Sequence, residues 1–221
     1  MAKNKTTLSE QLYDVIYEDI VHQRLNMGQK LTLKNLSEKY EVSYTPIREA
    51  LSRLTECGLV EYYSNCGVSV VDFTDADIQD IFRFAGELDA LAILYCRATP
   101  TTSLLLFELR QIVEESNRLL SENKAAEWKQ YSQDFHKIFY KYAQSTCLSD
   151  ASRRLRPKLE MLSCLYYNDR ANVERINREH VEIYEAISQR DYDAAAAMMR
   201  DHLQYDTLIA LQAFHEYKSS L

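Results

Sequence analysis

The stretch Val42–Leu51, which reads VSYTPIREAL, predicts the start of a well-defined helix. A polar, turn-prone Ser-Tyr-Thr precedes Pro46. Thr45 is expected to be the N-cap, since a threonine hydroxyl can accept a hydrogen bond from the first turn. Pro46 then suits the first helical position, where its missing N–H has no intrahelical acceptor. The sequence therefore predicts a helix that starts sharply at this proline.

This helix is amphipathic. Its apolar residues follow the i, i+3, i+4, i+7 spacing of a buried face, namely Ile47, Ala50, Leu51 and Leu54. Arg48 and Ser52 share a different face, close to the positive end of the helix dipole. An outward arginine at a helix N-terminus is suited to a DNA groove. A helix-turn-helix pattern alone is about as often only a packed helical pair, so the neighbouring elements matter.

The neighbouring segments predict two further helices and two strands. In chain order these are a helix over 7–25 stopped by Asn26-Met27-Gly28, a helix from about Thr32, and strands over 59–63 and 68–73 that flank the hairpin loop 64–67. Three helices followed by a β-hairpin predict a winged helix-turn-helix over residues 1–74.

Strand patterns disappear after Thr74 and Asp75, which are plausible caps at a domain boundary. Helical periodicity continues to the C-terminus, over about 75–98, 101–122, 125–145, 148–168, 173–189 and 191–217. Residues 75–221 are therefore expected to form an all-helical bundle of about six helices, and the whole chain is mainly α.

Composition favours a cytoplasmic helical protein. The 221 residues include only four glycines and three prolines, and the five cysteines are scattered without a C-x-x-C pair. We expect no membrane segment, because no run approaches 18 uncharged apolar residues. The formal net charge is −7, so non-specific DNA affinity should be modest. Specific DNA binding would then depend on a few Lys and Arg side chains at defined positions and on dimerisation.

The pattern resembles the GntR family of bacterial transcription regulators. The resemblance rests on Gly28-x-x-Leu31, the spaced motif from Leu36-Ser37 through Thr45-Pro46-x-Arg48 to Leu54, Gly58-Leu59-Val60 and Gly67-x-x-Val70. Arg83 and Glu87, with the histidines below, point to the FadR subfamily with its FCD effector domain. The resemblance covers nearly the whole chain.

The resemblance also implies which residues meet DNA. They are Lys34, the recognition-helix residues Ser43, Tyr44, Thr45 and Arg48, and the wing tip from Asn65 to Gly67. Tyr44 and Cys66 stand where relatives commonly place basic residues. Arg48 is then the better candidate for a bidentate guanine contact. Arg53 is expected to reach phosphate, or else to pair with Glu49 or Glu56.

Three histidines lie on apolar stripes of three different predicted helices: His136, His180 and His202. Converging imidazoles would bind Zn, Ni or Fe, but three separate core histidines are the alternative from spacing alone. Metal-binding FCD domains resemble this pattern but carry an Asp four residues before the first histidine, where this chain has Ser132. Asp134 is no substitute, because two residues turn a helix by about 200°. Water or an effector carboxylate would then complete a three-histidine set.

The same cavity is the expected effector pocket. FCD domains commonly bind small organic acids, and Arg83 and Ser132 are the candidate effector residues. The alternative for Arg83 is an ordinary salt bridge with Glu87 at i+4. His22 and His215 receive no role.

The first functional hypothesis is a homodimeric, ligand-responsive regulator, more often a repressor in this family, that reads a short palindrome in double-stranded DNA. The rival is a metal-dependent enzyme that uses the three histidines, although no H-E-x-x-H spacing supplies a general base. A third interpretation treats the bundle as a protein-interaction module.

Overall fold

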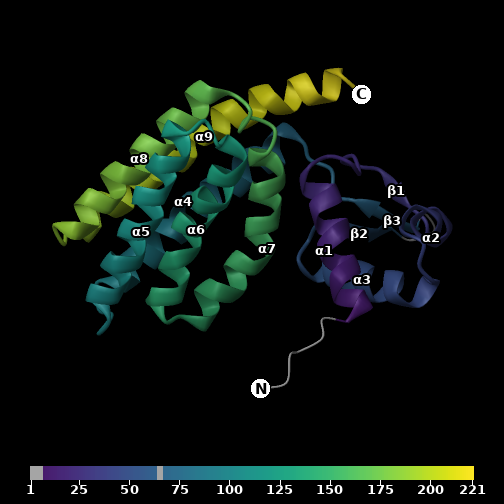
Figure 1. Cartoon of the computed structure of the whole chain (residues 1–221), viewed down its shortest axis with the longest axis horizontal. Coiled ribbons are helices and arrows are strands. Elements are labelled where there is room, and N and C mark those ends of the chain that lie inside the picture. Colours follow the sequence, from purple (N-terminus) through teal and green to yellow (C-terminus); the bar gives the residue numbers. More distant parts are fainter. Residues whose placement is uncertain (1–6, 64–66) are drawn as a thin grey trace. The chain divides into compact units, whose positions relative to one another are not determined.

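The computed structural model describes residues 7–63 and 67–221 and is mainly helical within them, with helices α1 to α9 and strands β1 to β3 (Figure 1). The chain divides into two compact units. The first is Met1–Thr74 with Arg153–Met161, and the second is Asp75–Ser152 with Leu162–Leu221. The fold class predicted from the sequence, a winged helix-turn-helix followed by a helical bundle, is confirmed.

The first unit is a three-helix fold with a small sheet. Its elements are α1 Leu8–Val21, β1 Lys30–Leu31, α2 Leu33–Tyr40, α3 Tyr44–Glu56, β2 Val60–Tyr63 and β3 Gly67–Val70. The sheet is antiparallel in the order β1-β3-β2, and Val60 pairs with Val70 in the hairpin. The short β1 was not predicted, because two residues carry no readable alternation.

Helix α3 begins two residues earlier than predicted. Ser43, not Thr45, is at the N-cap position, and its side chain makes no capping hydrogen bond. Pro46 is consequently the third helical residue rather than the first. Proline is tolerated there for the same reason, since the first four helical N–H groups have no intrahelical acceptor. The predicted apolar face is confirmed, with Ile47 and its three partners at most 2% exposed.

Helix α1 ends at Val21, four residues before the predicted end at 25. Gln23 adopts a left-handed conformation with φ of 58°, which a helix cannot continue through. Gly28, the predicted stop, instead has φ of 76° and its N–H donates to the Val70 carbonyl at 3.2 Å. The glycine therefore serves the sheet rather than the helix end.

The turn between α2 and α3 is held by side-chain and backbone features. Glu41 takes the left-handed conformation, with φ of 55°, at the end of α2. The Ser37 hydroxyl donates to the Val42 carbonyl at 2.6 Å. These two features fix how the chain enters α3, the helix that carries the expected DNA contacts.

The second unit is a helical bundle. Its helices are α4 Asp75–Cys96, α5 Thr102–Ser121, α6 Ala125–Ala143, α7 Thr146–Ser163, α8 Arg170–Ser188 and α9 Tyr192–Ser219, with part of α7 assigned to the first unit. These six agree with the six predicted helices to within a few residues. Large buried side chains fill the core, among them Phe82, Trp128, Phe135 and Phe139. Within the described residues, no helix is long and apolar enough to span a membrane.

Candidate nucleic-acid interface and histidine site

The N-terminal turn of α3 presents a polar, solvent-exposed surface. Ser43, Tyr44, Thr45 and Arg48 are all exposed, and Tyr44 exposes 47% of its surface. Directly beneath them Pro46 and Ile47 are buried. The apolar face of α3 therefore packs into the core of the first unit, and the polar face stays exposed to solvent. We call these four residues the reading face.

Lys34 lies on α2, and its side chain is 75% exposed with its Nζ 4.0 Å from Glu38. Such a loose surface pair leaves the cation available to phosphate.

The Arg53 guanidinium lies 4.3 Å from the Tyr13 ring centre, a cation–π contact with α1. It forms no ion pair with Glu49 or Glu56 among the described residues, so that predicted alternative is wrong.

The expected wing tip is only partly described. Asn65 and Cys66 lie outside the described residues, so the contact predicted for Asn65 is not placed. Gly67 begins β3 with φ of 89°, a conformation that favours glycine. Next to the hairpin turn, Tyr62 and Tyr63 are exposed on β2. These two aromatic residues were not predicted from the sequence, because strand patterning alone does not say which face is solvent-exposed.

A buried carboxylate anchors α2 to α1. Asp19 on α1 accepts hydrogen bonds from Arg24 at 2.5 Å and from Tyr40 at 2.8 Å, and it pairs with Lys39 at 2.8 Å. Burial alone would raise the pKa of Asp19, but these hydrogen bonds outweigh it and lower the pKa to about 2. Lys39 is thus engaged within the protein, which reduces the basic charge left for DNA.

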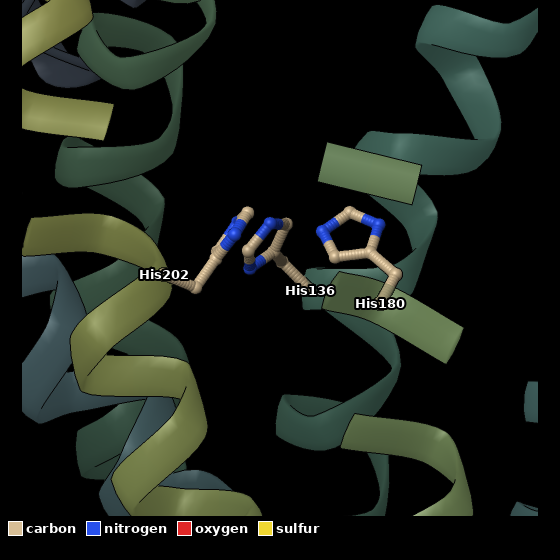
Figure 2. Close-up of side chains that lie close together, drawn as sticks. All are labelled: His136, His180 and His202. Carbon is tan, nitrogen blue, oxygen red and sulfur yellow. The ribbon is translucent and has the colours of Figure 1, made fainter. Parts of the chain in front are cut away.

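Three histidines meet inside the second unit. His136 of α6, His180 of α8 and His202 of α9 are all buried, and each offers a ligand nitrogen within 4.8 Å of the others. Figure 2 shows the rings next to one another, projecting from separate helices. Their ring centres lie 4.9 to 5.4 Å apart. The structure brings together the residues that the sequence placed on three different stripes.

Two of the three imidazoles face a carboxylate through Nδ1. His136 Nδ1 lies 2.8 Å from Asp89 Oδ2 on α4, and the same Asp89 also accepts a short hydrogen bond from the Tyr140 hydroxyl. His202 Nδ1 lies 2.6 Å from Glu179 Oε2 on α8. The His180 ring instead stacks on Phe135 at 4.1 Å. Asp89 and Glu179 were not singled out from the sequence, because nothing in their spacing marks them.

A partly buried ion-pair network adjoins His202. The Arg175 guanidinium donates to Glu179 at 2.5 Å and, by a short bond, to Asp206. The Tyr166 hydroxyl donates to Asp206 at 3.2 Å. Burial alone would raise the pKa of Glu179, but hydrogen bonds with His202 and Arg175 lower it. Two carboxylates thus share one guanidinium, which leaves excess negative charge beside the imidazole.

The donor set fits a small divalent cation. Neutral imidazole is a usual ligand for Zn²⁺, and ligands on a tetrahedral ion with bonds of about 2 Å lie about 3.4 Å apart. The ligand nitrogens lie within 4.8 Å of one another, so the largest separation would shorten by up to about 1.4 Å around a bound ion. His202 Nε2 is buried without a hydrogen-bond partner among the described residues, and Asp206 Oδ2 lies 3.8 Å away. A buried nitrogen without a partner is a feature that a bound ion would explain.

The two predicted effector residues lie in different surroundings. Ser132 is fully buried one helical turn before His136, and its Oγ lies 3.4 Å from the Tyr167 hydroxyl. The Arg83 side chain is 78% exposed and pairs with Asp80 at 2.5 Å. Glu87 pairs with Arg200 instead, so the alternative of an Arg83–Glu87 salt bridge is wrong.

Arg83 lines an open groove of about 540 Å³ between α4 and α9, with Phe82 and Leu208 among its neighbours. The groove does not include the buried histidines. Arg83 therefore does not lie beside the three histidines, and the prediction that it shares an effector pocket with them is wrong.

Comparison with protein-family models matches both units. Residues 8–70 match the model described as bacterial regulatory proteins of the gntR family, and residues 80–205 match the FCD domain. The chain belongs to the GntR family and carries an FCD domain. Residues 8–70 contain the reading face, and residues 80–205 contain all three histidines.

Similar proteins support this assignment. The HTH-type transcriptional repressor RspR of Escherichia coli K12 is 24% identical over 197 residues, covering 89% of this chain and 86% of RspR. The HTH-type transcriptional repressor GlaR of the same strain is 24% identical over 217 residues, covering 91% of this chain and 94% of GlaR. The solved structure of E. coli McbR/YncC shares the fold, with a TM-score of 0.78 and 19% identity over 95% of this chain and 100% of that one.

This GntR-family chain is thus a DNA-binding transcriptional regulator and not an enzyme. The family assignment and the regulator relatives decide against the metal-dependent enzyme considered from the sequence. The three histidines therefore lie in the FCD domain of a regulator and not in the active site of an enzyme.

Proposed function

We propose that this regulator is a cytoplasmic homodimeric repressor of the FadR subfamily that reads a short palindromic operator. The exposed reading face on α3 carries the proposal. Arg48 is the side chain with the geometry for guanine, since it projects from the exposed face of a helix whose opposite face is packed. Tyr44 supplies an aromatic contact where relatives commonly use a basic one, so operator preference depends on it.

Dimerisation is supported by a solvent-exposed apolar stripe on α4. Phe84, Leu91 and Tyr95 expose 49%, 39% and 48% of their surfaces, and the spacings of seven and four residues put them on one helix face. A two-fold contact through such a stripe would bury it in both copies. Two winged units would then present two reading faces to a palindrome.

The effector site is proposed at the three histidines. His136, His180 and His202 would hold a divalent ion, which supplies a Lewis-acid centre for a carboxylate when bound. Ser132, at the position of the missing acidic ligand, leaves room for water or an effector carboxylate in the coordination shell. A small organic acid would bias the population of DNA-competent arrangements.

Selection of duplexes from a random pool tests the central proposal. We expect enrichment of a short palindrome, loss of binding on addition of one organic acid, and steep salt dependence. Enrichment of an asymmetric site, with a monomer in sedimentation analysis, would contradict the dimeric mode. Binding that every candidate acid leaves unchanged would contradict effector control.

Metal analysis of protein purified without added metal or chelator tests the histidine site. We expect about one equivalent per chain, and we expect its loss in His180→Ala. His215→Ala is the matched control, because that histidine is exposed and pairs with Asp75. Equal metal content in wild type and His180→Ala would remove the site from the proposal.

A further inference from the structure

We infer that Asp89 and Glu179 are positioning residues that hold His136 and His202 in the Nδ1-protonated tautomer, so that both present Nε2 to a common metal. The inference rests on the proposed metal site. It assigns a role to two acidic residues from helices α4 and α8, neither of which belongs to the three-histidine set.

When both carboxylates are ionised, the contacts require this tautomer. An ionised carboxylate has no proton to donate, so the nitrogen that faces it must carry the hydrogen. His136 Nδ1 faces Asp89 at 2.8 Å and His202 Nδ1 faces Glu179 at 2.6 Å. In a neutral imidazole the other nitrogen, Nε2, then has the free lone pair that a metal needs.

Each carboxylate is itself held by a second group. Asp89 accepts a hydrogen bond from Tyr140, which lies on α6 one turn after His136. Glu179 accepts from Arg175, one turn before it on α8. A carboxylate that is hydrogen-bonded in this way cannot swing away from its imidazole. The same carboxylates also make the imidazole a stronger electron donor to a bound ion.

The third histidine is oriented differently. The His180 ring stacks on Phe135 with an angle of 15° between the planes, and this contact restricts its rotation. The inference therefore predicts an unequal response. Loss of Asp89 or Glu179 should disturb its own histidine and leave His180 unchanged.

The first experiment records the tautomers by long-range nitrogen–proton NMR on protein labelled with ¹⁵N-histidine and stripped of metal. We expect His136 and His202 to be protonated at Nδ1 in the wild type. Asp89→Ala should give a mixture of tautomers at His136 only, and Glu179→Ala a mixture at His202 only. Nε2-protonated His136 or His202 in the wild type would overturn the inference.

The second experiment measures Zn²⁺ affinity against a competing chromophoric chelator. We expect Asp89→Ala and Glu179→Ala each to weaken binding about 10- to 100-fold. Asp89→Asn and Glu179→Gln, which keep an oxygen acceptor, should lose less. Asp134→Asn on α6 and Glu182→Gln on α8 are matched controls, because both side chains are at least partly solvent-exposed.

The outcomes separate the two proposals. Wild-type protein that binds no Zn²⁺ contradicts the metal site, and the tautomer spectra still decide the orientation of the two rings. Wild-type protein that binds Zn²⁺, together with unchanged affinity in folded Asp89→Ala and Glu179→Ala, overturns the positioning role alone. Circular dichroism confirms that each variant is folded before either measurement.

Discussion

The reading face of α3 and the histidine site of the bundle are built in opposite ways. The polar side chains of α3 are exposed, and they are placed by the apolar face beneath them. Of the polar side chains around His202, Asp206 is buried and Arg175 and Glu179 are partly buried, and each is placed by another polar group. An exposed site thus depends on one helix and its packing, whereas a buried site depends on a network that spans several helices.

The largest expected effect comes from breaking that buried network. Arg175→Leu leaves Glu179 and Asp206 without the guanidinium they share, and the Arg175 side chain is only 12% exposed. Removing one partner of a buried ion pair costs about 3–5 kcal/mol. Urea denaturation should show this loss. The control Arg170→Leu, on the same helix but exposed, should change stability by under about 0.5 kcal/mol; equal effects would mean that the buried network does not govern this site.

The reading face should respond in affinity rather than stability. Arg48→Ala is expected to cost about 1–3 kcal/mol of operator affinity and to relax base preference at one position. Lys34→Ala should weaken binding evenly across sequences and lower the salt slope by about 1. Titrations at fixed salt on the operator and on a scrambled duplex distinguish them. An equal loss on both duplexes would make Arg48 a phosphate contact.

Asp19 is a buried carboxylate in the DNA-binding unit. Its removal can be compared with that of Arg175, to test whether a buried charge contributes a similar free energy of unfolding in both units. The pKa of Asp19, about 2 in the folded protein against 3.8 ordinarily, corresponds to about 2 kcal/mol of stability at neutral pH. Because the folded value is the lower one, this contribution is complete above about pH 5 and is lost as pH falls through the folded value of about 2. Asp19→Asn should therefore be destabilised at pH 7 and match the wild type at about pH 1. A difference independent of pH would contradict the charge argument.

The smallest expected effect is at Arg83. Its pair with Asp80 is largely exposed, so Arg83→Ala should change the unfolding free energy by under about 0.5 kcal/mol. A change in the effector titration of this variant would then mean that Arg83 contacts the effector, because the stability of the fold is unchanged. An unchanged effector titration would remove Arg83 from the effector site, in agreement with its position in the α4–α9 groove.

The sequence predicted the elements far better than the contacts between them. Helical periodicity located all six bundle helices, because a long amphipathic helix repeats its pattern over several turns. It placed the end of α1 and the start of α3 wrongly, since single residues such as Gln23 and Ser43 set a boundary and carry little pattern. Motif and spacing alone identified Arg48 and the three histidines as candidates.

What the sequence determined by itself was the order of elements, the family resemblance and the residue types available for each site. Only the tertiary structure decided which side chains meet. Asp89 and Glu179 lie 47 and 23 residues from the histidines they face. Arg83 belongs to an open groove and not to the buried cluster. Local pattern reports which face of a helix is apolar, but the partner across a helix interface depends on how whole helices pack, and no short window of sequence contains that information.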